Sequence, residues 1–240
     1  MEKQHLLYEG KAKKVYATNE GGVLWIEYKD EATAFNGEKK ATIAGKGRLN
    51  NEITSLLFSL LHEAGVNNHF IRKISDTEQL VRQVTIIPLE VVVRNIVAGS
   101  LAKRIGLQEG AVIEKPIVEF YYKNDVLGDP LLTEDHIALL QLASRDELVY
   151  MKQTALRIND VLTSLFHSCD LQLVDFKLEF GRDETGAVLL ADEISPDTCR
   201  LWDVYTKEKF DKDVFRRDLG DLTETYTKLL QRLGGLSCTK

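Results

Sequence analysis

The sequence has few cysteines and no excess of basic charge. Its three cysteines, Cys169, Cys199 and Cys238, are widely spaced and form no CxxC pair. The sequence therefore predicts neither a disulfide framework nor a zinc site, and a reducing cytoplasm is the expected location. The 31 basic residues are outnumbered by 37 acidic ones, giving a net charge of −6. This balance argues against a nucleic-acid or anionic-membrane surface.

Long apolar runs and several common catalytic motifs are also missing. The most apolar stretch, VTIIPLEVVV, is interrupted by Pro88 and Glu90, and the N-terminal MEKQHLLYEG has no stretch of signal-peptide length. We therefore expect a soluble, unexported protein without a membrane segment. The histidines show no HExxH spacing and no serine lies in GxSxG, so neither zinc hydrolysis nor a serine nucleophile is predicted.

The order of patterns along the chain predicts two lobes. With 240 residues and 44% apolar side chains, the chain can form one large domain or two small lobes. Residues 6–10, 13–18 and 23–28 are typical of strands, leucines at helical spacing predict a helix before Gly65, and residues 69–74, 79–87 and 89–97 indicate three more strands. The first hundred residues should form a sheet with a helix packed on it, an N-terminal lobe of residues 1–95.

Helices become more frequent in residues 96–240, the expected C-terminal lobe. Ser144 and Glu147 form a capping-box pattern that opens a helix through about His167, and apolar spacing predicts a last helix over residues 213–233. We therefore predict an α+β fold with an antiparallel N-terminal lobe, a larger mixed α/β C-terminal lobe and a ligand cleft between them.

A charged hairpin at residues 170–203 is the most informative segment. In an extended chain Asp175, Lys177 and Glu179 share one face, and apolar residues take the other. The turn GRDETG follows, and AVLLADE then returns with Asp192 and Glu193. A six-residue loop would place Asp192 opposite Asp175, so a metal shared by Glu179 and Asp192 would require a bulge or a longer loop.

The charges of this hairpin permit two interpretations. Converging acids repel one another unless a cation lies between them, and a lysine among them indicates an anion as well. Mg²⁺ with a phosphate satisfies both conditions. The alternative is a surface ion-pair ladder across a two-stranded edge, which contributes little to stability.

A second candidate phosphate site lies near the N-terminus, in YEGKAKKVY. Gly10 allows backbone N–H groups to approach a phosphate, and Lys11 and Lys13 share one face of an extended segment. The alternative is a lysine-rich edge strand that protects against aggregation.

Residues 86–100, IIPLEVVVRNIVAGS, provide a third candidate site. Glu90 and Arg94 share a strand face, and Gly99 and Ser100 begin a short helical segment. Arg94 and Ser100 would suit a phosphate. The alternative is that Arg94 pairs with Glu90 and that Ser100 is an ordinary N-cap.

A fourth segment, SPDTCRLWD, follows the hairpin. It presents Arg200, whose guanidinium suits a carboxylate or a phosphate. The alternative is a salt bridge from Arg200 to Asp197 or Asp203 that anchors the loop.

Taken together, YEGKAKKVY, IPLEVVVRNIVAGS, LVDFKLEFG and DEISPDTCRLWD resemble the motifs of the SAICAR synthetase family, the phosphoribosylaminoimidazole-succinocarboxamide synthases. The resemblance extends from about Leu6 to Gly235, in the family's order. It implies that ATP drives condensation of the CAIR carboxylate with L-aspartate, giving SAICAR, ADP and phosphate through an acyl phosphate in purine biosynthesis. It also implies Mg²⁺ and an N-terminal lobe similar to the nucleotide lobe of protein kinases.

The resemblance further implies a role for each matching residue. Asp175 and Lys177 would lie closest to the reacting carboxylate, and Glu179 and Asp192 would hold Mg²⁺. The CAIR phosphate or carboxylate would be bound by Arg94, Ser100 and Arg200. The nucleotide would be bordered by Lys11, Ala12, Lys13, Val15, Glu90 and Lys123.

Other functions and some positions stay open at this stage. A small-molecule kinase that stops at phosphoryl transfer could use the same residues, and a non-catalytic nucleotide sensor is a third reading. Asn36 stands where other family members carry an acid, and Cys238 is expected to be an exposed thiol in the tail. The oligomeric state is undetermined, with a homodimer as one option.

Overall fold

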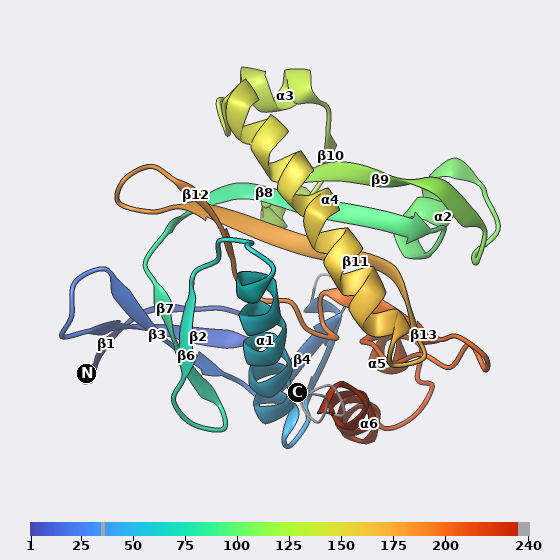
Figure 1. Ribbon diagram of the computed structural model, residues 1–240, viewed down its shortest axis with the longest axis horizontal. Helices are drawn as coiled ribbons and strands as arrows, with labels where there is room; N and C mark the ends of the chain where they lie inside the picture. The colour runs from blue at the N-terminus through green and yellow to red at the C-terminus, as the bar shows by residue number, and fades with distance from the viewer. Residues whose placement is uncertain (35–36, 235–240) are drawn as a thin grey trace.

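Residues 1–34 and 37–234, which the computed structural model describes, form three antiparallel sheets and seven helical segments (Figure 1). Asn36 and Cys238 lie outside these residues. The five-stranded sheet has the spatial order β1 (Lys3–Glu9), β2 (Lys13–Thr18), β3 (Val23–Tyr28), β7 (Glu78–Arg82) and β6 (Phe70–Lys73). A two-stranded sheet pairs β4 (Glu31–Ala34) with β5 (Lys39–Thr42). The three expected N-terminal strands are therefore confirmed.

The larger sheet carries the charged strand. Its spatial order is β10 (Leu131–Leu132), β9 (Val112–Tyr122), β8 (Thr85–Ile96), β11 (Leu171–Arg182) and β12 (Val188–Ala191), and β13 (Cys199–Asp203) also pairs with β11. Because β8 belongs here, the expectation that the first hundred residues form a single sheet is wrong. The boundary between residues 95 and 96 stays a prediction.

The expected division of strands around Pro88 is also wrong, because β8 continues through this residue. Proline has no N–H to donate to a neighbouring strand. The structure accommodates it with an irregularity, since the register between β8 and β11 shifts between Glu179 and Gly181. The carbonyl of Pro88 still accepts a hydrogen bond of 3.0 Å from the N–H of Lys123. The chain breaks instead between β7 and β8.

The structure contains the predicted helices except at the C-terminal end, together with two short helical segments over residues 125–127 and 134–139 that were not predicted. The helical segments are α1 (Lys46–Glu63), α2 (Gly99–Ile105), the 3₁₀ turn η2 (Asp125–Leu127), α3 (Glu134–Leu139), α4 (Arg145–His167), α5 (Asp213–Arg216) and α6 (Leu222–Gly234). The capping box of Ser144 and Glu147 opens α4 as predicted. The single helix expected over residues 213–233 is wrong, because Asp218 and Gly220 have φ values of 54° and 157° and interrupt the helical path.

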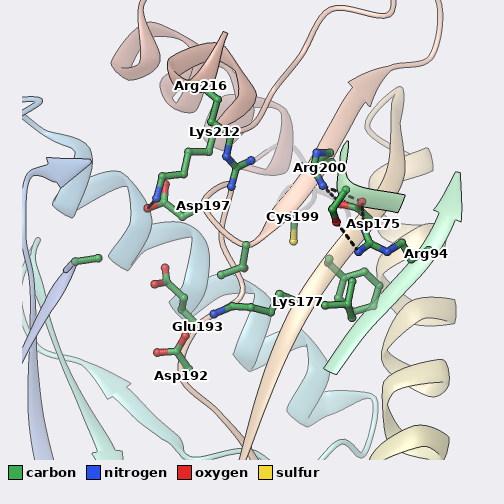
Figure 2. Close-up of a pocket in the computed structure, with 15 residues that line it drawn as sticks. Arg94, Asp175, Lys177, Asp192, Glu193, Asp197, Cys199, Arg200, Lys212 and Arg216 are labelled. Atoms are coloured by element: carbon green, nitrogen blue, oxygen red, sulfur yellow. Dashed lines mark hydrogen bonds and ion pairs between the residues drawn. The ribbon is translucent and has the colours of Figure 1, made fainter. Parts of the chain in front are cut away.

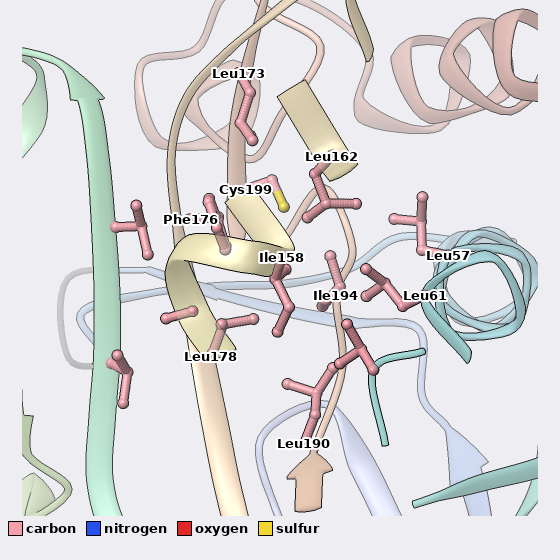
Figure 3. Close-up of a cluster of buried hydrophobic side chains, with 14 of the residues drawn as sticks. Leu57, Leu61, Ile158, Leu162, Leu173, Phe176, Leu178, Leu190, Ile194 and Cys199 are labelled. Atoms are coloured by element: carbon pink, nitrogen blue, oxygen red, sulfur yellow. The ribbon is translucent and has the colours of Figure 1, made fainter. Parts of the chain in front are cut away.

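The main apolar core occupies one face of the larger sheet. Helix α4 crosses this face (Figure 1), and Phe176, Leu178 and Phe180 of β11 are buried in the same cluster as its apolar side. Figure 3 shows Ile158 and Leu162 of α4 in that cluster, which also includes residues from α1. Burial of each such side chain contributes about 1.5–3 kcal/mol. Because this face of β11 is fixed in the core, its charged side chains must face the opposite way.

Two expectations drawn from composition can be compared with the structure. Cys169 and Cys199 are free thiols, both buried. Within residues 1–34 and 37–234, no helix has the length and apolar character needed to cross a membrane.

Candidate active site

The charged strand β11 lies inside the sheet. It pairs with β8 along one side and with β12 and β13 along the other. Asp175 and Glu179 are 3% and 2% exposed, so the alternative of an exposed ladder on a two-stranded edge is wrong. Charges buried to this extent need partners, because desolvation penalises an unpaired ion heavily.

The hairpin register differs from the expected one. Glu179 pairs with Ala191, and Arg182 with Val188, so the turn contains five residues. Asp183 closes it, because its carboxylate accepts hydrogen bonds from the N–H groups of Thr185 and Ala187. Asp192 therefore follows directly after the partner of Glu179, and its placement opposite Asp175 is wrong. Glu179 and Asp192, the two acids proposed for Mg²⁺, therefore lie at the same end of the charged row formed by Asp175, Lys177 and Glu179.

The chain leaves the sheet between β12 and β13. Asp192 has a φ of 60°, and residues 192–198 then form a loop before β13 begins. The loop returns to β11 where the N–H of Lys177 donates to the carbonyl of Thr198 at 2.9 Å. Figure 2 shows Asp192 and Glu193 of this loop near the amino group of Lys177.

Asp175 joins the two arginines that the sequence indicated as anion ligands. Nη1 of Arg94 lies 2.8 Å from its carboxylate, and Nη1 of Arg200 lies 2.9 Å from it (Figure 2). Ser100 accepts a hydrogen bond of 3.2 Å from Arg94, and it lies within α2 rather than at its N-cap. The alternative pairings of Arg94 with Glu90 and of Arg200 with Asp197 or Asp203 are therefore wrong.

Both arginines are held by further acids. Nε of Arg94 lies 2.8 Å from Glu119, and Nε of Arg200 lies 3.2 Å from Asp213. Burial would lower the pKa of each guanidinium, but Asp175 together with Glu119 at Arg94 and Asp213 at Arg200 outweighs it, and both pKa values are raised above the usual value. Both groups are therefore permanently cationic.

Lys177 stands at the centre of the charged row. Its Nζ lies 2.7 Å from Glu90 and 3.0 Å from Glu179, and Lys123 contacts the other oxygen of Glu179. Burial would lower the pKa of Lys177, but the carboxylates of Glu179 and Glu90 raise it well above its usual range. The lysine is therefore protonated and held in place by two acids.

Lys11 and Lys13, just before and at the start of strand β2 in the five-stranded sheet, extend toward the charged residues of β11 and the loop after β12. Lys13 contacts Asp192 and lies 3.2 Å from Glu193, whereas the more exposed Lys11 lies 2.7 Å from Asp125. Strand β2, which carries Lys13, lies between β1 and β3, so the edge-strand alternative is wrong. Burial would raise the pKa of Asp192, but Lys13 and Lys177 hold it below its usual value.

Two adjoining cavities contain the predicted residues. A cavity of ≈ 340 Å³ is lined by Arg94, Ser100, Asp175 and Arg200, among others. A second, of ≈ 440 Å³, is lined by Lys11, Lys13, Val15, Glu90, Lys123 and Glu179, together with apolar residues of β3 and β7. Ala12, Lys177, Asp192 and Glu193 line both cavities. The structure therefore brings all the predicted site residues to one continuous site, and their individual roles remain predictions.

Several residues of the site were not found from the sequence. The side chain of Asp197 is 4% exposed, with Lys46 2.7 Å and Lys212 3.2 Å away, and it accepts a hydrogen bond of 2.7 Å from Tyr226. Asp197 and Lys212 line the smaller cavity, as does Arg216. No local motif connects these positions, because Lys46 lies 151 residues before Asp197 and only the fold brings them together. The only signal for this group in the sequence was the segment SPDTCR, which contains Asp197 but not its lysine partners.

His69, also overlooked, lines the larger cavity. It is 5% exposed, and within the described part of the chain its Nε2 has no hydrogen-bond partner. Burial, together with the charge of Lys13, lowers the pKa of His69 to about 4. The imidazole is therefore neutral near pH 7.

The carboxylates of Glu179 and Asp192 are the candidate metal ligands. Among residues 1–34 and 37–234, no group of three or more acidic, histidine or cysteine side chains could hold a metal ion by itself. Mg²⁺ commonly takes only one or two protein carboxylates and completes its shell with water and substrate phosphates. Two acids beside a cavity rich in lysine are compatible with that arrangement.

Comparisons with known proteins agree with this geometry. The family model described as SAICAR synthetase matches residues 6–233. A phosphoribosylaminoimidazole-succinocarboxamide synthase of Anoxybacillus flavithermus is 92% identical over the full length of both chains. The crystal structure of the corresponding synthase from Ehrlichia chaffeensis has a TM-score of 0.94 and 47% identity, covering 96% of this chain and 98% of the other. A SAICAR synthetase solved in complex with ADP has a TM-score of 0.93 and 48% identity over the same shares. The chain therefore belongs to the SAICAR synthetase family.

Proposed function

We propose that the chain catalyses the reaction for which its family is named, the ATP-dependent condensation of CAIR with L-aspartate to give SAICAR, ADP and phosphate in purine biosynthesis. One observation carries the assignment to this site: the protonated amine of Lys177 lies where a lysine-lined cavity and an arginine-lined cavity meet. A ligase that uses ATP to activate a carboxylate must bring the γ-phosphate and that carboxylate to one point. Lys177 marks such a point.

ATP occupies the larger cavity in this proposal, between a nucleotide lobe similar to that of protein kinases and the larger C-terminal lobe. Val15, Ile26 and Val81 supply an apolar wall suited to a base, and Lys11 and Lys13 supply charge for the phosphates. Glu90 and Lys123 border the same cavity. The ADP complex of the relative with 48% identity supports this placement.

CAIR occupies the smaller cavity. Arg94, Ser100 and Arg200 bind its phosphate, since planar guanidinium groups can donate two parallel hydrogen bonds to a phosphate or carboxylate. Asp175 holds the two guanidinium groups in place. The carboxylate of Asp175 also borders the cavity. In this proposal it therefore lies close to the imidazole ring of CAIR and to the carboxylate that the ring carries.

Mg²⁺ would be held by Glu179 and Asp192 together with phosphate oxygens of the nucleotide. Oxygen ligands suit a hard cation, and both acids border the larger cavity beside the phosphate lysines. When bound, the ion offsets charge that accumulates on the transferring phosphoryl group. Lys13 and Lys123, which contact these acids in the structure, would turn toward the phosphates.

Lys177 acts on the reacting groups. Its fixed positive charge offsets the negative charge of the CAIR carboxylate, so that an oxygen of the carboxylate can attack the γ-phosphorus while the bond to ADP breaks. The aspartate amine then attacks the acyl carbon and loses a proton, and phosphate leaves. The hydrogen bonds from Lys177 to Glu90 and Glu179 keep the amine in position before substrates arrive.

An assay with ATP, Mg²⁺, CAIR and each of several amino acids tests the proposal. ADP and inorganic phosphate should both form, in equal amounts, and only when L-aspartate is present. ADP formed without inorganic phosphate would indicate the small-molecule kinase instead, an alternative that the full-length synthase relatives do not favour. No turnover with any amino acid would contradict the ligase.

The free thiols of Cys169 and Cys199 fit a reducing, cytoplasmic location.

A further inference from the structure

Gly99 faces the guanidinium group of Arg200 at very short range. It is the first residue of α2, and its φ of 54° lies in the left-handed region. A Cβ built on Gly99 would lie 2.6 Å from Nη2, 2.8 Å from Cζ and 3.0 Å from Nη1 of Arg200. These distances are well below the 3.4–4 Å of ordinary contacts. Only a glycine therefore leaves room for Arg200 where it stands.

Arg200 cannot easily move away from such a contact. Its side chain is mostly buried, Nε lies 3.2 Å from Asp213, and Nη1 donates to both oxygens of Asp175 at 3.0 and 2.9 Å. A shift that relieved a clash at Gly99 would lengthen hydrogen bonds to one or both acids. Hydrogen bonds between charged groups are among the strongest in proteins, so the displacement would be costly.

We propose that Gly99 is a positioning residue for Arg200. Its missing side chain lets the guanidinium lie against the backbone at the start of α2, beside Ser100 and facing the smaller cavity. Arg200 is thereby held between Gly99 on one side and the acids Asp175 and Asp213 on the other. The identity of the anion rests on the proposed function, but the positioning itself does not.

The matched control is Gly106, which follows the last residue of the same helix. Its φ of 69° is also left-handed, but nothing lies within 4 Å of a Cβ built on it. Gly99→Ala and Gly106→Ala therefore carry a similar cost of backbone strain. Only the first introduces a clash with Arg200.

Isothermal titration with CAIR and with ADP distinguishes the two variants. Gly99→Ala should weaken CAIR binding about ten- to a hundredfold, as expected for loss of a charge-assisted contact, and leave ADP binding within about twofold. Gly106→Ala should change neither. In an Arg200→Ala background, Gly99→Ala should cause no further loss of CAIR affinity. Equal effects of the two glycine substitutions, or additive effects of Gly99→Ala and Arg200→Ala, would overturn the proposal.

A second measurement does not depend on the substrate. The ¹⁵Nε–¹Hε resonance of Arg200, assigned by its loss in Arg200→Lys, should shift in Gly99→Ala and stay in place in Gly106→Ala. If Arg200→Ala itself leaves CAIR affinity unchanged, the substrate assignment fails and this resonance alone decides the positioning role. If Gly99→Ala does not fold, the double variant with Arg200→Ala should recover the fold, and failure of both variants would contradict the clash.

Discussion

The carboxylate of Asp175 accepts hydrogen bonds of 2.9 and 3.0 Å from the guanidinium group of Arg200. The same carboxylate lies 2.8 Å from Arg94, so one acid is shared by two guanidinium groups. Removal of one member of a buried ion pair leaves the others uncompensated, which is strongly destabilising. An incoming anion could replace part of the lost charge.

We expect Asp175→Asn to lower the thermal midpoint and phosphate to restore much of it. The increase caused by phosphate should be larger in this variant than in the unmodified protein, because only the variant has two arginines without their shared acid. Differential scanning fluorimetry over a phosphate titration measures the effect. Asp160→Asn, an exposed position on α4, serves as control. Identical phosphate responses in all three proteins would show that Asp175 and the anion do not share the arginines.

Arg94→Ala and Arg200→Ala should weaken CAIR binding more than ATP binding. Loss of a charge-assisted contact costs roughly 1.5–3 kcal/mol, or about ten- to a hundredfold in affinity. Titration calorimetry of each ligand tests this, with Arg72→Ala on exposed β6 as control. Because Arg94 is buried against Glu119 and Asp175, Arg94→Lys provides a variant that keeps the charge if Arg94→Ala does not fold. Unchanged CAIR affinity in both alanine variants would remove these arginines from the substrate site.

Glu179→Gln and Asp192→Asn should each abolish Mg²⁺-supported turnover. A neutral amide keeps the shape of the side chain but loses the charge that a hard cation requires. The measurements are the Mg²⁺ dependence of turnover and the effect of Mg²⁺ on ADP affinity. Glu184→Gln, exposed in the turn of the same hairpin, should retain both. If one variant keeps a normal Mg²⁺ dependence, that acid is not a ligand, and Asp175 becomes the next candidate.

His69 should make the stability of the protein depend on pH. Its pKa falls from 6.5 to about 4 on folding, chiefly through burial, so the folded state disfavours the protonated imidazole. Its contribution is fully present above pH 6.5 and is lost as the pH falls toward 4. The loss is about 3 kcal/mol, at 1.36 kcal/mol for each pH unit of displacement. Denaturant unfolding from pH 7 to pH 4 should show a flatter curve for His69→Gln, whereas His5→Gln, on exposed β1, should follow the unmodified protein. Parallel curves for all three would rule out this role.

The sequence predicted local structure well where one residue pattern was sufficient. The alternation in β11 placed Phe176 and Leu178 in the core and Lys177 on the opposite face, because a two-residue period leaves no other choice once one face is buried. The capping box at Ser144 marked the start of α4 for a similar reason, since its hydrogen bonds are made within four residues.

Relationships that depend on tertiary packing were not predictable from local patterns. The hairpin register was misjudged because the Asp183 side chain shortens the turn. Strand β8 was predicted as two strands divided at Pro88, whereas the larger sheet tolerates this proline at a bulge. The pairing of Lys46 with Asp197 requires α1 to pack beside a loop 151 residues away. The motifs therefore identified which residues gather at the site, and the structure identified which of them contact one another.

The last prediction concerns the order of chemical steps. A carboxylate is a poor acylating agent until one of its oxygens becomes part of a phosphate leaving group, so the CAIR carboxylate should attack the γ-phosphate before aspartate attacks carbon. Lys177 lies between the two cavities, 2.7 Å from Glu90 and 3.0 Å from Glu179, and carries a fixed positive charge. With ¹⁸O in the CAIR carboxylate, one labelled oxygen should appear in the released phosphate, as mass spectrometry can detect. Lys177→Met should slow this transfer far more than it weakens ATP binding, while Lys207→Met, on the surface after β13, should leave it unchanged. Release of phosphate without label would exclude activation of this carboxylate, and with it the role proposed for Lys177.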